Sequence, residues 1–294
     1  MASLKEVRNR INSVRSTQQI TKAMKMVAAA KLRRSQEAIV RMRPYAQRLM
    51  TLLQDLSASL GDSVENPFAN KREVKNVLVV VISSDRGLAG AFNSNAFKGT
   101  LQLIREKYAT QSATGNITIM PIGKKANEFF IRRNYKTISQ FAELFSLLSF
   151  EAVRSAAELA MEGFLSSKYD AVEIVYNEFK NVATQVVRQR QFLPIVPTER
   201  ATNQTRETGY IFEPSQEDIF KELVPKSLKV QFYEYMLESN AAEHGARMTA
   251  MDKATENAGD LLKQLRLTYN QTRQAAITKE ILEIVGGAEA LAAS

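Results

Sequence analysis

The sequence predicts an α/β protein in which long N- and C-terminal helices form an antiparallel coiled coil on a small Rossmann-like α/β domain. Three observations favour this class. The first 60 residues contain no glycine, β-branched apolar runs typical of buried strands lie in the middle of the chain, and a second long helical pattern fills its last part. The expected domains are residues 1–60 (coiled-coil helix), 74–196 (α/β foot domain) and 211–294 (coiled-coil helix).

The N-terminal helix has a clear start and a heptad pattern. Ser3-Leu4-Lys5-Glu6 is a capping box, in which the Ser3 side chain can accept a hydrogen bond from the Glu6 N–H while Glu6 reaches back. Pro44 predicts a kink or a local adjustment within the helix. The apolar stripe comprises Leu4, Val7, Ile11 and Val14, followed at heptad spacing by Ala28, Leu32, Ser35, Ile39, Met42, Ala46, Leu49, Leu53, Leu56 and Leu60.

The positive charge of the protein belongs to this helix. The whole chain carries a net charge of +9, whereas residues 1–50 contain 12 Lys or Arg and two Glu, a net +10. The remaining 244 residues therefore carry a net charge of −1. We expect the partner of the helix to be acidic, so that either phosphates or a cluster of protein carboxylates would serve.

Residues 20–34 combine five basic residues with Met, Ala and Val. On a helical wheel one face holds Ile20, Met24, Val27, Ala28 and Leu32, and the opposite face holds Met26 and Ala29 beside Lys22, Lys25 and Arg33. A two-helix coiled coil buries only the first face, so the second suggests another, adaptable contact, to which Met is suited. A single exposed Met on a solvated face is the simpler interpretation, and both stay open on this pattern alone.

The basic N-terminal helix admits three interpretations. A nucleic-acid-binding arm fits the charge, but only Tyr45 among the first 60 residues could stack on a base. A mitochondrial presequence would also be amphipathic, basic and poor in acids. The third is a helix that passes through an acidic protein collar.

The middle of the chain alternates strand and helix patterns. Strands are expected at residues 77–83, 117–122, 171–176 and 184–195, and helices at about 93–108, 124–133 and 149–167. This alternation predicts right-handed parallel crossovers in a small sheet. Residues 61–75 and 197–214 are expected to be a linker and a polar loop.

The C-terminal pattern predicts a short helix that starts at Ser215 and ends at Pro225, followed by a helix of about 65 residues. At ~1.5 Å per residue the two long helices would measure roughly 85 and 100 Å, so they must overhang a domain only roughly 40 Å across. The heptad positions of the second helix are Leu237, Ala241, His244, Met248, Met251, Thr255, Ala258, Leu262, Leu265, Tyr269, Thr272 and Ala276. Because these positions are rich in Ala, Thr and Met and poor in Leu before Leu262, the pair is weakly stabilised alone and should gain stability inside a larger assembly.

No catalytic, cofactor-binding or metal-binding constellation is expected. "SSDRGLAG" follows a buried strand but lacks the spacing of phosphate-binding loops, so Ser84, Asp85, Arg86 and Gly87 are interpreted as a turn with a protein contact. His244 is expected to be a packed or partly exposed helix residue, and the acids show no metal-ligand spacing. The absence of cysteine excludes disulfides and thiol chemistry and fits a reducing compartment. No apolar run is long enough for a transmembrane segment.

Four motifs, in order along the chain, resemble the gamma subunit of F-type ATP synthases. These are "ITKAMKMVAAAKL", "SSDRGLAGAFN", "AAEHGARMTAM" and "LRLTYNQTRQAAITKEILEIVGGAEAL". The resemblance begins within the first few residues, which argues against a presequence. The chain has Ala89-Gly90-Ala91 where the family often has Cys-Gly-Gly, and it lacks the cysteine-bearing insertion of chloroplast relatives, so thiol control is not expected.

The resemblance implies a non-catalytic rotor stalk with no cofactor. It would carry torque between a membrane ring of c subunits, where protons flow, and a catalytic hexamer of alpha and beta subunits, with epsilon beside its α/β domain. The implied contacts with the hexamer, including acidic loops of beta, involve Lys22, Met24, Lys25, Met26, Lys31, Arg33, Arg273, Gln274, Thr278 and Glu280. No nucleic acid is then expected. A start directly on the capping box suggests the cytoplasmic side of a bacterial inner membrane, with the mitochondrial matrix side as the alternative.

Overall fold

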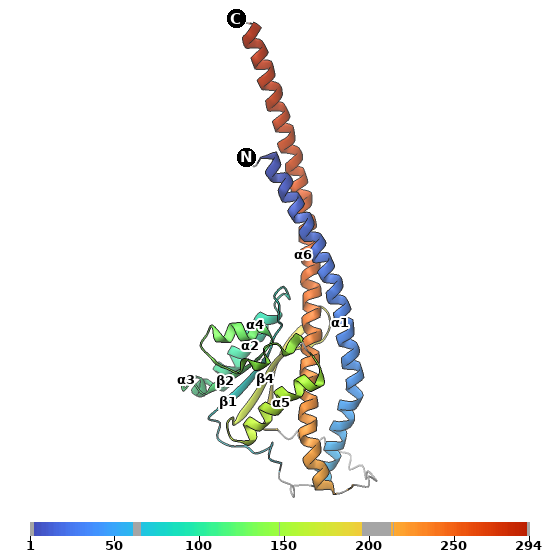
Figure 1. Cartoon of the computed structure of the whole chain (residues 1–294), viewed down its shortest axis with the longest axis vertical. Helices are drawn as coiled ribbons and strands as arrows, with labels where there is room; N and C mark the ends of the chain where they lie inside the picture. The colour runs from blue at the N-terminus through green and yellow to red at the C-terminus, as the bar shows by residue number, and fades with distance from the viewer. Residues whose placement is uncertain (1–2, 61–65, 147, 196–212, 214, 293–294) are drawn as a thin grey trace. The chain divides into compact units, whose positions relative to one another are not determined.

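The computed structural model describes residues 3–60, 66–146, 148–195, 213 and 215–292. The long helices α1 (Leu4–Leu60) and α6 (Gln216–Ala292) contain 57 and 77 residues (Figure 1). The other helices and strands are β1 (Val77–Ile82), α2 (Phe92–Lys107), α3 (Ala109–Ala113), β2 (Ile117–Ile122), α4 (Lys124–Ile131), β3 (Lys136–Thr137), two 3₁₀ turns (Ser139–Phe141 and Leu144–Ser146), α5 (Phe150–Leu165), β4 (Ala171–Phe179) and β5 (Gln185–Leu193).

The chain divides into two compact units, and both long helices run through each of them. Residues 28–247 form one unit, called the α/β unit below, which holds the sheet and the helices that cover it. Residues 1–27 and 248–294 form the other, called the helical unit, which consists of the N-terminal part of α1 and the C-terminal part of α6.

The sheet of the α/β unit has five strands in the order β3-β2-β1-β4-β5. β1 pairs in parallel with β2 and β4, and β2 pairs in parallel with β3, as expected for strands joined through helices. β5 is antiparallel to β4, because the few residues between them allow only a hairpin connection. The four predicted strands are confirmed. β3 was not predicted, and with two residues it is too short to form a pattern.

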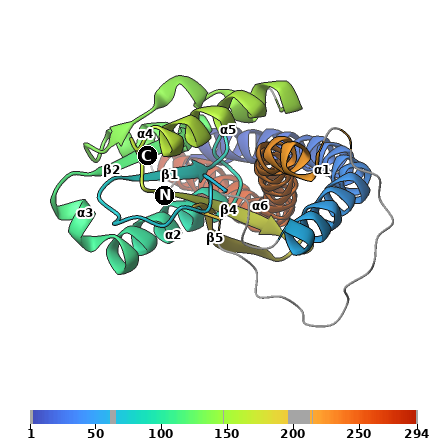
Figure 2. The same cartoon turned by 90° about the horizontal axis from the view of Figure 1, so that it is seen from below.

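β1 is buried on both faces, which explains its continuous β-branched sequence. Leu78 and Ile82 belong to one hydrophobic core, to which α5 and α6 contribute. Val77 and Val81 belong to a second core, to which α2 and α4 contribute. Seen from below in Figure 2, α2 and α5 lie on opposite sides of the sheet.

Three long-range contacts join α1 and α6, and the two in the helical unit show that the helices are antiparallel there. In the α/β unit the Ser35 hydroxyl donates to the Asn240 side-chain oxygen at 2.6 Å. In the helical unit the Thr255 hydroxyl donates to Thr21 at 2.8 Å, and Lys25 pairs with Asp252. Residue numbers rise along one helix as they fall along the other, so the predicted antiparallel pairing is confirmed.

The predicted end of a helix at Pro225 is wrong. α6 begins with the Ser215 cap, whose hydroxyl accepts from the Asp218 N–H at 3.1 Å, and then runs without interruption through Pro225. A proline inside a helix costs about 3 kcal/mol. Val224 and Leu228, on either side of Pro225, are buried in the core between α6 and the sheet. Burial of this face outweighs the lost backbone hydrogen bond. α1 likewise continues through Pro44.

The predicted linker and polar loop fall partly or mostly outside the described residues. Residues 61–65, 196–212 and 214 lie outside the described residues, so what was predicted for them stays a prediction.

Candidate functional site

The contact between α1 and α6 in the helical unit is polar around Thr21 and Thr255, near residues 27 and 248 where the unit ends. The Gln18 amide donates to the Thr255 carbonyl at 3.4 Å, and Thr21 and Thr255 share the hydroxyl contact described above. Lys25 Nζ lies 2.5 Å from the Asp252 carboxylate. Polar pairs satisfy one another here but contribute less stabilisation than packed leucines would. This polar part of the helix pair overlaps residues 20–34, the stretch that combines basic residues with Met, Ala and Val.

A groove of about 520 Å³ opens beside this polar stretch. Its lining comprises Gln18, Gln19, Lys22, Lys25, Met26, Asp252 and Thr255. Three of the predicted contact residues, Lys22, Lys25 and Met26, therefore surround one hollow. Lys22 is exposed and has no ion pair within the described part of the chain, whereas Lys25 is held by Asp252.

The predicted face of residues 20–34 is partly wrong. Ile20 and Val27 were expected against the partner helix, but they are 59% and 57% exposed. Ala28 and Leu32 of the predicted face are buried, as expected. The other positions in contact with α6 are Thr21 and Lys25, which were not predicted on this face, because the 3–4 spacing of a helix pair places polar residues in the contact as well as apolar ones.

The exposure of the other residues in this stretch agrees with the helical wheel for Met26 and only partly for Met24 and Ala29. Met26 is 60% exposed, as predicted, whereas Ala29 and Met24 are partly buried. Together with Ile20 and Val27, Met26 leaves a surface that is more apolar than the sequence indicated.

Lys31 and Arg33 lie in the α1 segment of the α/β unit and are exposed. Arg33 pairs with Glu37 one turn further along at 3.0 Å, a solvent-exposed pair of little energetic weight. The Lys31 side chain has no ion pair among the described residues. Lys31 therefore remains available to an acidic partner, while Arg33 is already paired with Glu37.

The second predicted group, Arg273, Gln274, Thr278 and Glu280, lies on α6 in the helical unit, and all four residues are exposed. The antiparallel register of Thr21 with Thr255 places the first residue of α1 opposite about Arg273. Beyond that point α6 has no α1 residue to pair with.

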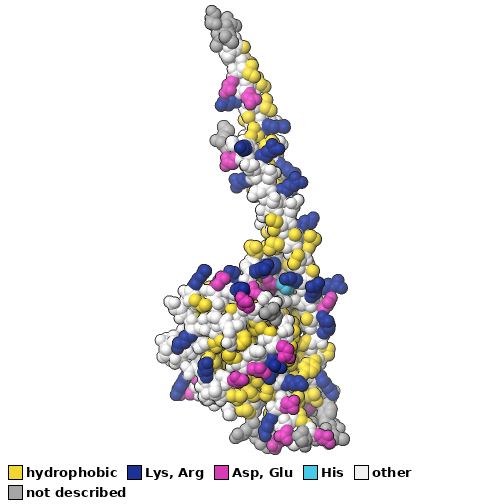
Figure 3. Space-filling view, in the orientation of Figure 1, with side chains coloured by type: hydrophobic (Ala, Val, Ile, Leu, Met, Phe, Trp, Pro, Cys, Tyr) yellow, Lys and Arg dark blue, Asp and Glu magenta, His cyan; other side chains and the backbone are white. Residues whose placement is uncertain are grey.

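The unpaired end of α6 carries exposed apolar side chains that the sequence analysis missed. They are Ile277, Ile281, Leu282, Ile284 and Val285, each at least 48% exposed. Figure 3 shows apolar side chains gathered along this end. Exposed apolar surface of this kind marks a protein contact. The sequence does contain a signal for this surface, because the apolar pattern of α6 continues beyond about Arg273, the last position that has an α1 residue opposite it.

The turn after β1 is fixed by its own polar groups. The Ser84 N–H donates to the Asn93 side-chain oxygen at 3.0 Å, and the Ser84 hydroxyl donates to the Arg86 carbonyl at 2.6 Å. Asp85 accepts from the Lys124 N–H at 3.1 Å, and burial raises the pKa of its carboxyl. The predicted turn is present.

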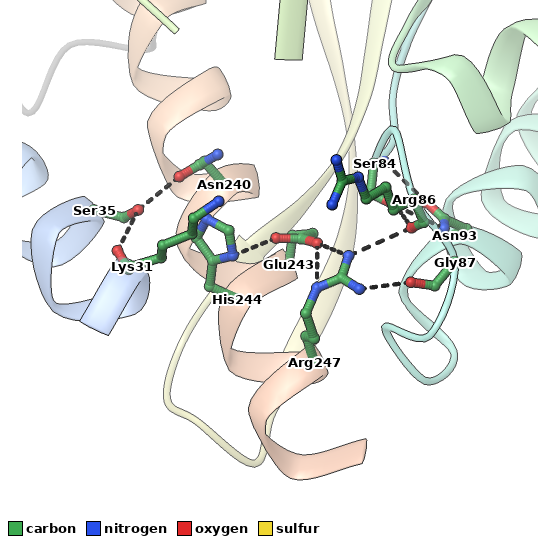
Figure 4. A network of polar contacts seen from close by, with 10 residues as sticks. All are labelled: Lys31, Ser35, Ser84, Arg86, Gly87, Asn93, Asn240, Glu243, His244 and Arg247. Carbon is green, nitrogen blue, oxygen red and sulfur yellow. Dashed lines mark hydrogen bonds and ion pairs between the residues drawn. The ribbon is translucent and has the colours of Figure 1, made fainter. Parts of the chain in front are cut away.

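The protein contact of this turn comes from the same chain. Arg247 on α6 donates to the Gly87 carbonyl at 2.6 Å and to the Arg86 carbonyl at 3.4 Å (Figure 4). The same guanidinium binds the carboxylate of Glu243, one turn earlier on α6. Thus the motifs "SSDRGLAG" and "AAEHGARMTAM", which are far apart in sequence, meet in the α/β unit.

Glu243 is a buried carboxylate between Arg247 and His244. Its side chain is only 3% exposed, and His244 Nδ1 lies 2.5 Å from its second oxygen. Burial alone would raise the pKa of Glu243, but His244 and Arg247 together hold it below its ordinary value. Glu243 therefore stays ionised and orients Arg247 toward the turn. His244 is partly buried on the helix, as predicted.

α6 also fills the place where doubly wound sheets bind ligands. In such sheets the ligand crevice lies at the carboxyl ends of the strands where the strand order reverses, here between β1 and β4. Ala242 and Ala246 of α6 pack there against Ala89, Phe92 and Phe179. In this protein the crevice is therefore filled by α6, which packs against the sheet there.

Within the described residues, no three or more His, Asp or Glu side chains gather as they would around a metal ion. A search of the same residues finds no helix with the length and apolar character needed to cross a membrane.

Glu238 gives the contact between α6 and the sheet a pH dependence. Burial, with the nearby carboxylates of Glu234 and Glu178, raises the pKa of Glu238 to about 7. Because this value lies above the ordinary 4.5, the folded state favours the protonated carboxyl, and stability falls as pH rises from about 4.5 to about 7.

We expect Glu238→Gln to raise the melting temperature of the α/β unit at pH 8 by a few degrees and to change it little at pH 5. Glu162→Gln, at an exposed position on α5, is the matched control and should change neither value. Thermal melts at both pH values measure the difference. An equal shift at pH 5 and pH 8 would show that the charge of Glu238 is not the cause.

Comparison with known proteins gives one consistent family. Residues 3–291 match the family model described as ATP synthase. The chain is 59% identical over 293 residues to the ATP synthase gamma chain of Cytophaga hutchinsonii, with 99% of each protein covered. It is 53% identical over 291 residues to that of Christiangramia forsetii, again with 99% of each covered.

Solved structures share the fold. A chain from the mitochondrial ATP synthase of Euglena gracilis (OSCP/F1/c-ring) aligns with a TM-score of 0.66 at 23% identity, covering 99% of this chain and 95% of that one. A chain from the central stalk/c-ring structure of the Tetrahymena thermophila enzyme aligns with a TM-score of 0.56 at 24% identity, covering 80% and 99%.

Proposed function

The chain belongs to the ATP synthase gamma chain family, and from that membership we propose that it is the non-catalytic, torque-transmitting stalk subunit of a proton-translocating F-type ATP synthase. One observation carries the proposal beyond the family. The two long helices expose basic and apolar side chains together, as at Lys22 and Met26 on α1 and at Arg273 and Ile277 on α6.

The helical unit has the surface expected of a shaft held inside other subunits. The C-terminal end of α6, which has no α1 residues beside it, exposes apolar side chains. This surface suits an apolar partner that surrounds the helix and contacts it without fixed ion pairs. The polar stretch around Lys22 and Met26 suits a partner with carboxylates and adaptable packing. We propose the alpha and beta subunits as that partner, with acidic loops of beta at the basic stretch.

The α/β unit has the construction expected of a rigid attachment. α6 is buried against the sheet, fills its ligand crevice, and is bonded to the turn after β1 through Arg247. Torque applied to the sheet would therefore pass into α6 without slippage. We propose that this unit contacts the c-ring and epsilon, so that ring rotation turns the helical unit and drives ATP synthesis, while hydrolysis reverses the sequence.

The relatives of the chain in bacteria support a place on the membrane surface of a bacterial cell. We propose that the subunit is peripheral and lies on the cytoplasmic side of the inner membrane, because that is where a rotor coupled to ATP made in the cell must act.

Replacing Arg273 and Gln274 together by alanine should lower coupled ATP synthesis about 10-fold and leave the melting temperature unchanged, since both side chains are exposed at the end of the paired region. Synthesis by reconstituted complexes in energised vesicles measures the effect. The control is Gln264→Ala with Lys263→Ala, two other exposed neighbours on α6. Full synthesis in the Arg273/Gln274 variant would remove these residues from the coupling surface.

Mixing the chain with purified alpha and beta subunits tests the proposed function itself. We expect a stable complex that hydrolyses ATP, whereas the chain alone should show no ATPase activity. A chain that fails to join the complex, or that hydrolyses ATP by itself, would contradict the proposal.

A further inference from the structure

A groove of about 650 Å³, called the α5 groove below, lies between α1, α5 and α6 in the α/β unit. Figure 2 shows these three helices next to one another. The apolar surface of the groove comes from Met42, Tyr45, Phe150, Pro225, Val230 and Tyr233. Sites that bind small molecules measure roughly 300–1,000 Å³, so the α5 groove is large enough for an organic ligand.

Aromatic rings from all three helices line the α5 groove. Phe150 of α5 and Tyr233 of α6 pack edge to face, with ring centroids 5.5 Å apart. Tyr45 of α1 is 49% exposed and makes no ring contact within the described part of the chain. Because these rings and their apolar neighbours face an open hollow, an apolar chain that covers them removes apolar surface from water, which is favourable.

Three hydrogen-bond donors of the α5 groove have no hydrogen-bond or ion-pair partner among the described residues. They are the ammonium of Lys226, which is exposed, and the hydroxyls of Tyr45 and Tyr233. Burial raises the pKa of Tyr233, so its hydroxyl stays protonated and can donate at neutral pH. Donors without acceptors suit an anionic group, because a carboxylate accepts several hydrogen bonds and donates none.

The charges of the α5 groove favour a ligand with one negative charge. Arg154 and Lys229 already pair with acids of α5, among them Glu158 at 3.6 and 2.6 Å. Lys226 is therefore the one lining cation without an ion pair in the described part of the chain. Glu222 also lines the groove, one helical turn before Lys226, and would repel a second negative charge on the ligand.

We propose that the α5 groove binds a single-chain alkyl carboxylate, such as a fatty acid, with its chain along the apolar surface and its carboxylate at Lys226. The ligand contacts α1 through Met42 and Tyr45 as well as α5 and α6. It therefore fastens α1 to the rest of the α/β unit and stabilises the folded chain. This inference does not depend on the proposed function.

Calorimetric titration of the full chain with dodecanoate at pH 8, below its micelle concentration, tests the inference. Lys226→Gln should weaken binding about 5-fold, because it removes the ammonium, whereas Glu222→Gln should strengthen binding about 2- to 5-fold, because it removes a repulsion. Lys221→Gln, at an exposed position of α6 that does not line the groove, is the matched control and should bind like the wild type. Dodecanoate should also raise the melting temperature of the wild-type chain by a few degrees.

Ligands that differ from dodecanoate in one property check the chain and the charge. Octanoate should bind at least about 10-fold more weakly, because each fully buried methylene contributes a factor of about 4. Dodecyl phosphate, which is dianionic, and dodecyltrimethylammonium, which is cationic, should both bind more weakly than dodecanoate. Tighter binding of either compound, equal affinity of Lys226→Gln and Glu222→Gln for dodecanoate, or no binding by the wild-type chain would overturn the inference and leave the proposed function intact.

Discussion

Converting Lys22, Lys31 and Arg33 together to glutamate is expected to slow assembly with the alpha/beta hexamer at least about 10-fold at low salt and to reduce coupled ATP synthesis strongly. The three side chains are exposed cations on α1. Reversal replaces attraction to an acidic partner by repulsion, which acts most on the rate of encounter. Lys25 is left unchanged, because a glutamate there would face Asp252 and disturb the helix pair itself.

Assembly rates measured at low and high salt check this prediction. The matched control reverses Lys71, Lys98 and Lys180, three exposed lysines of the α/β unit, so the net charge changes by the same amount. If the control slows assembly equally, overall charge and not the α1 surface is responsible. Normal assembly of the α1 variant at low salt would refute the electrostatic role of this helix.

Arg247→Met is expected to destabilise the α/β unit by about 3–5 kcal/mol at neutral pH, because it leaves the carboxylate of Glu243 buried without its arginine partner. The melting temperature should fall by roughly 6–20 °C for a unit of this size. The pKa of Glu243 is depressed in the folded protein, so its stabilising contribution is present at neutral pH and declines as pH falls. The difference from wild type should therefore narrow in acid.

The double variant Glu243→Gln with Arg247→Met tests the cause. It removes the buried charge together with its partner, so it should recover a large part of the lost stability. Thermal melts of the single and double variants at pH 7 and pH 4.5 give the comparison. A double variant no more stable than Arg247→Met would show that the hydrogen bonds to the turn carbonyls, and not the buried carboxylate, determine the loss.

The fold could be predicted to a large extent because its signals are local. The Ser3 cap, the buried run of β1 and the heptad positions of both long helices depend on residues close in sequence. Pro225 was misread for the same reason. Its local signal ends a helix, whereas the burial of Val224 and Leu228 depends on contacts that a sequence pattern does not contain.

The candidate site was predictable only in part. Charge and composition identified the α1 surface around Lys22 and Met26, but the helical wheel assigned Ile20 and Val27 to the wrong face, since the register with α6 was unknown. The bonds from Arg247 to the turn after β1 join residues 160 positions apart, which no local pattern encodes. The exposure of the apolar end of α6 could not be predicted, because it depends on where α1 begins opposite α6, which the structure shows.

Direct observation of rotation tests whether the subunit carries torque. The chain contains no cysteine, so Ser112→Cys on the exposed helix α3 provides one attachment point for a bead on the α/β unit. With the alpha/beta hexamer fixed to a surface and ATP supplied, we expect the bead to turn continuously in one direction. Steady ATP hydrolysis by the same complexes with a bead that never turns would contradict a torque-transmitting stalk.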